Sequence, residues 1–189
     1  MKKDHAGFKR RPFLTPIWLT ALAIAVALAS FIFAVWVWGT TGSTTIFVVR
    51  HAEQDLDSCP ADPPLNAAGE ARAALLARML GDGRALGHLD AIYVSPARCN
   101  RLTASPLAAR LGISATVAPA DDPRSLARRV LREHGGGKVL IIGHADTVPQ
   151  IVAALSDRKI PDIGAEEYGI MYIVAVPRIG SANLLRVNY

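Results

Sequence analysis

Two hydrophobic segments that lie far apart in the sequence, each leading to a histidine, constrain the fold of this chain most. Residues 44–49 (TTIFVV) precede Arg50 and His51, and residues 138–142 (KVLII) precede His144 after one glycine. Short apolar runs rich in β-branched residues are typical of buried strands. In an open α/β sheet, ligands bind at the carboxyl ends of the strands. We therefore expect both imidazoles and the guanidinium of Arg50 at one such edge, as a site for an anion and for nucleophilic chemistry.

The rest of the chain after residue 44 alternates between helical and strand patterns. Residues 66–81, for example, are rich in Ala and Leu at helical spacing. Further helices are expected over 97–111, 122–134 and 147–155, and further strands over 89–94, 113–117, 168–176 and 183–187. The last two strands are expected to pair with each other. Strands that alternate with helices predict an α/β fold, here a three-layer α/β/α sandwich with a mostly parallel central sheet.

The beginning of the chain has a different composition. Residues 17–38 contain no charged side chain, and as a helix they would span about 33 Å at about 1.5 Å per residue, enough to cross a bilayer. Trp18, Trp36 and Trp38 stand near the ends, where amphipathic rings favour the headgroup level. The competing interpretation is a cleaved signal peptide, with small residues at 27–30, although its apolar region is usually only about 7–15 residues long. The sequence thus predicts a basic tail over 1–16, a transmembrane helix or signal anchor over 17–38, a linker over 39–44 and a catalytic domain over 45–189.

The basic residues of the tail account for most of the net charge. Residues 1–16 contain Lys and Arg well in excess of their one Asp, whereas the chain after residue 43 is close to neutral. The net charge of +5 therefore gives no support for nucleic-acid binding. Because basic residues flanking a span favour the cytoplasmic side, we expect the tail in the cytoplasm. The domain would then lie on the outer, periplasmic or extracellular, side of the cytoplasmic membrane.

Further motifs follow the first histidine in order along the chain. Residues 62–69 read DPPLNAAG, residues 93–96 read YVSP, Thr103 and Ala104 follow, and residues 147–149 read TVP. Together with Arg50-His51 and Gly143-His144, these motifs resemble those of the histidine phosphatase superfamily, which has the phosphoglycerate-mutase-like fold. The resemblance covers about residues 44–189.

The resemblance implies a phosphatase in which His51 is the nucleophile. In the family, the first histidine becomes phosphorylated and water then hydrolyses the phosphohistidine; the second histidine, here His144, stabilises the transferred group. The charge of Arg50 disfavours protonation of His51, and its donors can hold phosphate oxygens bidentately. The reaction needs no metal or other cofactor, and the sequence has no paired cysteines or His-Glu-x-x-His motif. The expected partners are a phosphorylated substrate, small or associated with the cell envelope, and the membrane through the N-terminal helix.

One position departs from the family pattern. The family usually reads Ser-x-x-x-Arg-x-x-x-Thr after the second strand, with a phosphate-binding arginine four residues after the serine, and this position is Cys99 here. Arg98 or Arg101 could take over that role, and Arg98 is favoured because it lies at the less regular junction of strand and helix. If neither does, phosphate binding weakens. The alternative function is then a catalytically degenerate module that binds a phosphate or a phosphoglycan.

The sequence leaves the general acid open among four carboxylates. Asp121 and Asp122 follow the third strand, and Glu53 lies in the first loop. Asp122 is already explained as the N-cap of the following helix. Asp146, two residues after the second histidine, fits a general acid and a second N-cap equally well.

The remaining reactive side chains have simpler expectations. Cys59 and Cys99 both fall near the expected ligand-binding edge, so they form either one disulfide or two unpaired thiols. His5, His88 and His134 lie in the tail, a loop and a helix end, and we expect them at the surface.

Overall fold

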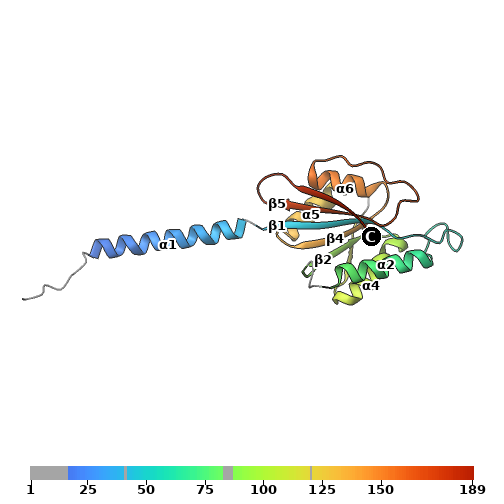
Figure 1. Ribbon diagram of the computed structural model, residues 1–189, viewed down its shortest axis with the longest axis horizontal. Helices are drawn as coiled ribbons and strands as arrows, with labels where there is room; N and C mark the ends of the chain where they lie inside the picture. Colours follow the sequence, from blue (N-terminus) through green and yellow to red (C-terminus); the bar gives the residue numbers. More distant parts are fainter. Residues whose placement is uncertain (1–16, 41, 83–86, 120) are drawn as a thin grey trace, which may run out of the picture. The chain divides into compact units, whose positions relative to one another are not determined.

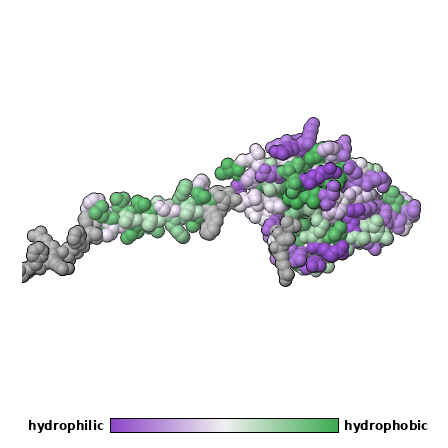
Figure 2. Space-filling model, in the orientation of Figure 1, coloured by the Kyte–Doolittle hydropathy of each residue, from purple (hydrophilic) through white to green (hydrophobic). Residues whose placement is uncertain are grey.

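The computed structural model describes residues 17–40, 42–82, 87–119 and 121–189, and the chain divides into two compact units, Met1–Thr40 and Thr41–Tyr189 (Figure 1). The expected basic tail over 1–16, which includes His5, lies outside the described residues. In the first unit, the helix α1 (Ile17–Thr40) exposes apolar side chains along its length (Figure 2). Its segment Ile17–Val37 has a mean hydropathy of 2.4 and is long and apolar enough to cross a membrane. An N-terminal signal sequence shares this property.

A mixed sheet forms the centre of the second unit. Its strands are β1 (Ser43–Arg50), β2 (Ala91–Val94), β3 (Ala115–Val117), β4 (Lys138–Gly143), β5 (Ile170–Pro177) and β6 (Asn183–Asn188), in the order β3-β2-β4-β1-β5-β6. The first four strands of that order are parallel, whereas β5 is antiparallel to β1 and β6 to β5. The prediction of a mostly parallel sheet is confirmed, and the last two strands pair as expected. β3 begins two residues later than predicted.

Helices cover both faces of this sheet. α2 (Ala67–Leu80) and α4 (Arg98–Leu111) lie on one face, and α5 (Pro123–Glu133) and α6 (Thr147–Ser156) lie on the other (Figure 1). The residues of β1 alternate between the two cores: Phe47 packs with α2 and α4, and Ile46 with α5 and α6. A strand covered on both faces is apolar throughout, which explains the continuous hydrophobic run. The predicted three-layer α/β/α sandwich is confirmed.

The start of α2 fixes the loop that follows β1. The side-chain oxygen of Asn66 caps the helix by accepting a hydrogen bond of 2.9 Å from the Gly69 N–H. Gly69 packs against the backbone of Glu53, and a Cβ atom at this position would stand 2.2 Å from the Glu53 carbonyl oxygen. Only glycine permits this approach, so the motif over 62–69 holds the first residues after His51 against the domain.

Candidate active site

The pairing of β1 with β4 brings the two histidines to the same level of the sheet. Arg50 lies opposite Gly143 in the parallel register, and His51 and His144 are the next residues of the two strands' continuations. The backbone N–H of His51 donates to the Gly143 carbonyl oxygen at 2.9 Å. The centroids of the two imidazole rings are 5.3 Å apart, with an edge-to-face arrangement. The two rings thus share one edge of the sheet, as the sequence predicts.

The ring of His51 has a defined tautomer. Its Nδ1 lies 2.8 Å from the carbonyl oxygen of Ala52, and since a carbonyl oxygen only accepts, Nδ1 carries the proton and Nε2 holds a lone pair. The side chain is 4% exposed. Burial lowers the pKa of His51 to about 4, helped by the charge of Arg50 and opposed by the Ala52 hydrogen bond. His51 is therefore a neutral imidazole near pH 7, and burial contributes more to this than the charge of Arg50 on which the sequence argument relied.

The ring of His144 is held by side chains of another strand and helix. Its Nε2 lies 2.9 Å from the hydroxyl oxygen of Ser95 and 3.3 Å from Nδ2 of Asn100. Asn100 Nδ2 also donates to the same hydroxyl oxygen. With Nε2 engaged in this way, Nδ1 of His144 is the nitrogen left to meet a ligand. Burial lowers the pKa of His144, assisted by Arg50 and opposed by the carboxylate of Asp146.

The flanking residues of the Ser-x-x-x-Cys-x-x-x-Thr segment connect all three strand ends. Ser95 follows β2 and contacts the His144 ring. Thr103, within α4, accepts a hydrogen bond of 3.0 Å from the Ala52 N–H and donates one of 2.7 Å to the Cys99 carbonyl oxygen. The first residue of the segment therefore contacts the ring of His144, and the last holds the backbone N–H of the residue that follows His51.

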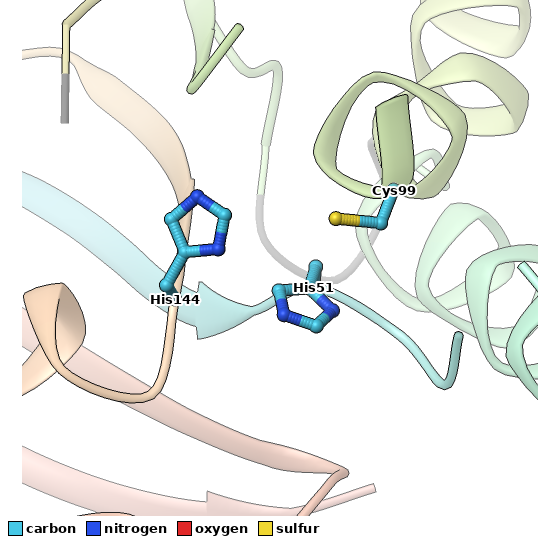
Figure 3. A group of neighbouring side chains, drawn as sticks. All are labelled: His51, Cys99 and His144. Carbon is cyan, nitrogen blue, oxygen red and sulfur yellow. The ribbon is translucent and has the colours of Figure 1, made fainter. Parts of the chain in front are cut away.

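Cys99, between these two positions, points into the site. It lies in the first turn of α4 and is 1% exposed, and burial raises the pKa of its thiol. Figure 3 shows its sulfur directed toward the two imidazole rings. One ligand atom from each of His51, Cys99 and His144 can be chosen so that all three lie within 4.8 Å of one another. Cys59 and Cys99 are both free thiols, so the possible disulfide does not form.

Arg50 turns its guanidinium toward the loop before β5. Nη1 donates to the carbonyl oxygens of Gly164 at 2.8 Å and Glu167 at 3.1 Å, and Nη2 donates to the Tyr168 hydroxyl at 3.1 Å. The guanidinium carbon also stacks 4.0 Å from the centroid of the Tyr168 ring. Nε is buried and has no acceptor among the described residues. Protein groups thus occupy the end of the guanidinium, and the edge formed by Nε–H and the second Nη2–H remains for an anion.

The structure does not bring Arg98 or Arg101 into this arrangement. Both residues are exposed. The backbone N–H of Arg98 donates to Asp62, and the guanidinium of Arg101 donates to the Pro96 carbonyl oxygen. Within the described part of the chain, neither forms a hydrogen bond or ion pair with either histidine. A phosphate-binding role for one of them stays a prediction, and it requires the side chain to move.

The candidate carboxylates occupy three different situations. Glu53 accepts two hydrogen bonds of 2.9 Å from Nε of Arg72, and this pairing lowers the pKa of Glu53. Asp122 caps α5, as predicted, by accepting from the Ser125 N–H at 2.9 Å. Asp146 is exposed, and its side chain makes no capping hydrogen bond. Asp146 thus stands at the N-cap position of α6, as one of the two interpretations expected, but without the side-chain hydrogen bond of a capping residue. Asp121 is exposed as well.

Three residues of the site escaped the sequence argument. Asn100 adjoins Cys99 and could have been suspected only as a polar residue in an otherwise helical pattern; it proves fully buried. Arg72 lies in the Ala-rich helix α2, and no motif in the sequence indicates that it pairs with Glu53. Tyr168 was assigned to a strand, but it lies in the loop before β5 and contacts Arg50 from 118 positions away in the sequence. Of the other histidines, His88 is exposed, and His134 is half-buried with Nε2 3.1 Å from the Tyr93 hydroxyl.

Comparisons with known proteins show which family and which solved structures this chain is similar to. The family model of the histidine phosphatase superfamily, branch 1, matches residues 46–120. A protein histidine phosphatase, SixA, solved with tungstate, superposes with a TM-score of 0.63 at 19% sequence identity, over 76% of this chain and 96% of its own. A mycobacterial glucosyl-3-phosphoglycerate phosphatase gives 0.61 at 15% identity, over 77% and 99%. No curated protein sequence matches the chain.

These structures share the fold of this chain, but their sequence identity to it is too low to assign their substrates to it. The family model covers the first strand from Ile46 onward, the first histidine and the whole segment from Ser95 to Thr103. The second histidine falls outside the matched residues, but the strand register places it beside the first. The chain is thus similar to the histidine phosphatase superfamily, branch 1, in a family model over residues 46–120 and in its fold.

Proposed function

We propose that the domain is a phosphatase that hydrolyses a phosphomonoester through a phosphohistidine on His51. The observation that carries the proposal is the tautomer of this ring. Because Nδ1 donates to the Ala52 carbonyl oxygen, Nε2 presents its lone pair to the site beside the second imidazole. A buried imidazole that remains neutral well below pH 7 is a competent nucleophile toward phosphorus.

The neighbouring groups have separate roles in this mechanism. Nε2 of His51 forms a bond to phosphorus as the bond to the leaving oxygen breaks, and water then cleaves the phosphohistidine. Nδ1 of His144 and the free edge of Arg50 donate to the equatorial oxygens, where charge is spread in the transition state. Asp146, exposed and not engaged in capping, delivers the proton to the leaving oxygen. The mechanism uses no metal ion.

Trapping the intermediate tests the proposal directly. The full chain in detergent, supplied with an aryl phosphate and excess chelator, should release the aryl alcohol and incorporate acid-labile, alkali-stable phosphate during turnover. His51→Ala should lose both, with turnover reduced on the order of 10⁴-fold or more because the nucleophile is gone. His88→Ala, at an exposed position, is the matched control and should behave as the parent. Turnover by His51→Ala near the parent rate would contradict the mechanism.

A second candidate function follows from residue 99. Cys99 replaces an arginine of the family pattern, and both nearby arginines face solvent. The site therefore has fewer cationic donors than the pattern supplies, which favours a module that binds a phosphate or phosphoglycan without hydrolysing it. Saturable binding of an aryl phosphate with no labelled His51 at any pH would support this alternative.

The N-terminal helix supports a proposed location. An uncleaved α1 would anchor the chain in the cytoplasmic membrane with its basic tail in the cytoplasm and the domain outside. The expected substrate is then a small or envelope-associated phosphomonoester. Protease added to cells whose outer membrane or cell wall has been permeabilised, with the cytoplasmic membrane intact, should digest the domain. Mass spectrometry of the membrane-bound chain should find its first residues still present. A shortened, soluble product would indicate a cleaved signal peptide.

A further inference from the structure

The thiol of Cys99, a soft metal ligand, lies close to the two histidines of the proposed phosphatase site. Cys99 Sγ and one nitrogen from each of His51 and His144 lie within 4.8 Å of one another. In Figure 3 the three side chains, which come from the ends of β1 and β4 and from the start of α4, are neighbours, with the Cys99 sulfur directed toward the two rings. Two imidazoles and a thiolate are a ligand set typical of zinc and its soft or borderline neighbours, and unsuited to Mg²⁺ or Ca²⁺.

The hydrogen bonds around the cluster orient its donors for a metal. Nδ1 of His51 donates to the Ala52 carbonyl oxygen at 2.8 Å, which leaves Nε2 as a ligand. Nε2 of His144 is engaged by Ser95 and Asn100, so Nδ1 is the nitrogen of that ring that faces the site. It becomes the second ligand when its proton moves to Nε2, where the Ser95 hydroxyl oxygen can accept it. Burial raises the pKa of the Cys99 thiol, so the metal itself has to displace the proton. The resulting thiolate lies in the first turn of α4, at the positive end of the helix dipole.

The distances between the ligand atoms and the charges around them are compatible with the binding of one metal ion by all three residues. Ligand atoms around a tetrahedral Zn²⁺ lie about 3.5 Å apart, given bonds of about 2.0–2.3 Å, so contraction by about 1 Å closes the largest separation. The charges of Glu53 and Asp146 act on the nearest histidines and favour a bound cation, whereas the charge of Arg50 opposes it. An arginine at position 99 would exclude a cation, whereas a thiolate there neutralises part of its charge.

We propose that His51, Cys99 and His144 form a binding site for a borderline-soft divalent metal, represented by Zn²⁺, and that this metal competes with phosphoryl transfer. Binding displaces the Cys99 thiol proton to solvent and forms a sulfur–metal bond. The lone pair on Nε2 of His51 is donated to the metal at the same time, so it can no longer attack phosphorus.

The binding test uses cobalt as a spectroscopic probe, because a thiolate–Co²⁺ bond has a charge-transfer absorption that other ligands lack. The full chain in detergent, without a histidine tag, is titrated with Co²⁺ and then Zn²⁺. The band should saturate at one equivalent and disappear when Zn²⁺ displaces Co²⁺. Cys99→Ala should abolish the band and weaken Zn²⁺ binding by at least about 100-fold. Cys59→Ala, which removes the other free thiol, is the matched control and should leave both unchanged.

Two further measurements keep the outcome decisive. Cys99→Ser guards against a packing defect, and both variants should retain the circular dichroism and melting temperature of the parent. Absence of the band in the parent, or a band that survives in Cys99→Ala, would overturn the metal site.

The competition is tested separately by turnover. Zn²⁺ should inhibit the parent over the concentration range that fills the cobalt site, and chelator should restore activity. Cys99→Ala should keep its turnover in the presence of Zn²⁺. Full turnover by the parent at saturating Zn²⁺ would overturn the competition. The cobalt titration needs no turnover, so an inactive protein would contradict the proposed phosphatase without deciding the metal site.

Discussion

The two histidines reach the same point of the site by different means. His51 is fixed by the carbonyl oxygen of the next residue in its own chain segment, so the turn after β1 sets its tautomer. His144 is fixed by Ser95, directly after β2, and by Asn100, in the first turn of α4. The first ring is therefore oriented locally, whereas the second depends on correct docking of another strand end. We therefore expect changes elsewhere in the site to disturb the orientation of the His144 ring more than that of the His51 ring.

Among the variants that distinguish the roles of the two histidines, His144→Ala should have the largest effect on turnover. This variant removes a donor to the phosphoryl oxygens but leaves the nucleophile, so turnover should fall about 10²–10³-fold. His51 should still become labelled from an aryl phosphate, only more slowly, because its own hydrogen bond to Ala52 does not involve the second ring.

Rapid-quench measurement of labelled His51 beside steady-state turnover tests this expectation. His134→Ala serves as the control for removal of a half-buried histidine, one that lies at the end of α5 and contacts the Tyr93 hydroxyl. Complete loss of labelling in His144→Ala would show that the second ring is needed for attack itself, and the proposed division of roles would be wrong.

The pH dependence of stability is expected to follow the first ring. Its folded pKa of about 4 lies below the ordinary 6.5, so the unfolded chain binds more protons between these values. Stability is therefore fully present above about pH 6.5 and is lost as the pH falls toward 4, by at most about 3 kcal/mol. His51→Gln should lack this component.

Urea unfolding followed by circular dichroism at several pH values, with chelator present throughout, compares the parent with His51→Gln. The difference between their free energies of unfolding should shrink or reverse in favour of the variant as the pH is lowered. Parallel curves for the two proteins would contradict the neutral buried state of His51.

The sequence could predict the parts of the site that depend on strand ends. A hydrophobic run followed by a histidine needs only the rule that ligands meet the carboxyl ends of strands, so the pairing of His51 with His144 was predictable. The three-layer α/β/α architecture was also predictable, because a chain of alternating strands and helices can bury its apolar faces in only a few ways. Residues placed by loop conformation were not predictable. Tyr168 reaches Arg50 through a loop whose path no periodicity encodes.

A third prediction concerns the docking of the second ring. Ser95→Ala removes the hydroxyl that holds Nε2 of His144 and that receives the Asn100 side chain. Turnover should fall about 10-fold, in kcat more than in KM, because an ordinary hydrogen bond is worth about 0.5–1.5 kcal/mol. Ser95→Thr should rescue part of the loss by restoring the hydroxyl.

The matched variant for the first ring is Thr103→Val, which removes the acceptor of the Ala52 N–H but not the His51 hydrogen bond. It should lower stability while leaving kcat within a few-fold of the parent. If Thr103→Val reduces kcat as strongly as Ser95→Ala, the His51 ring is not locally oriented and the contrast between the two histidines fails.

The smallest effect is expected at Tyr168, which supports the arginine beside the first ring. Tyr168→Phe deletes the 3.1 Å hydrogen bond from Nη2 of Arg50 but keeps the ring that stacks on the guanidinium at 4.0 Å. The edge formed by Nε–H and the other Nη2–H does not change, so KM for an aryl phosphate should change by only a few-fold with kcat retained. Tyr168→Leu also removes the stacking and should raise KM further. Equal kinetics for the two variants would show that stacking does not position Arg50, and a large fall in kcat for Tyr168→Phe would instead place the hydroxyl among the groups that contact the reacting phosphoryl group.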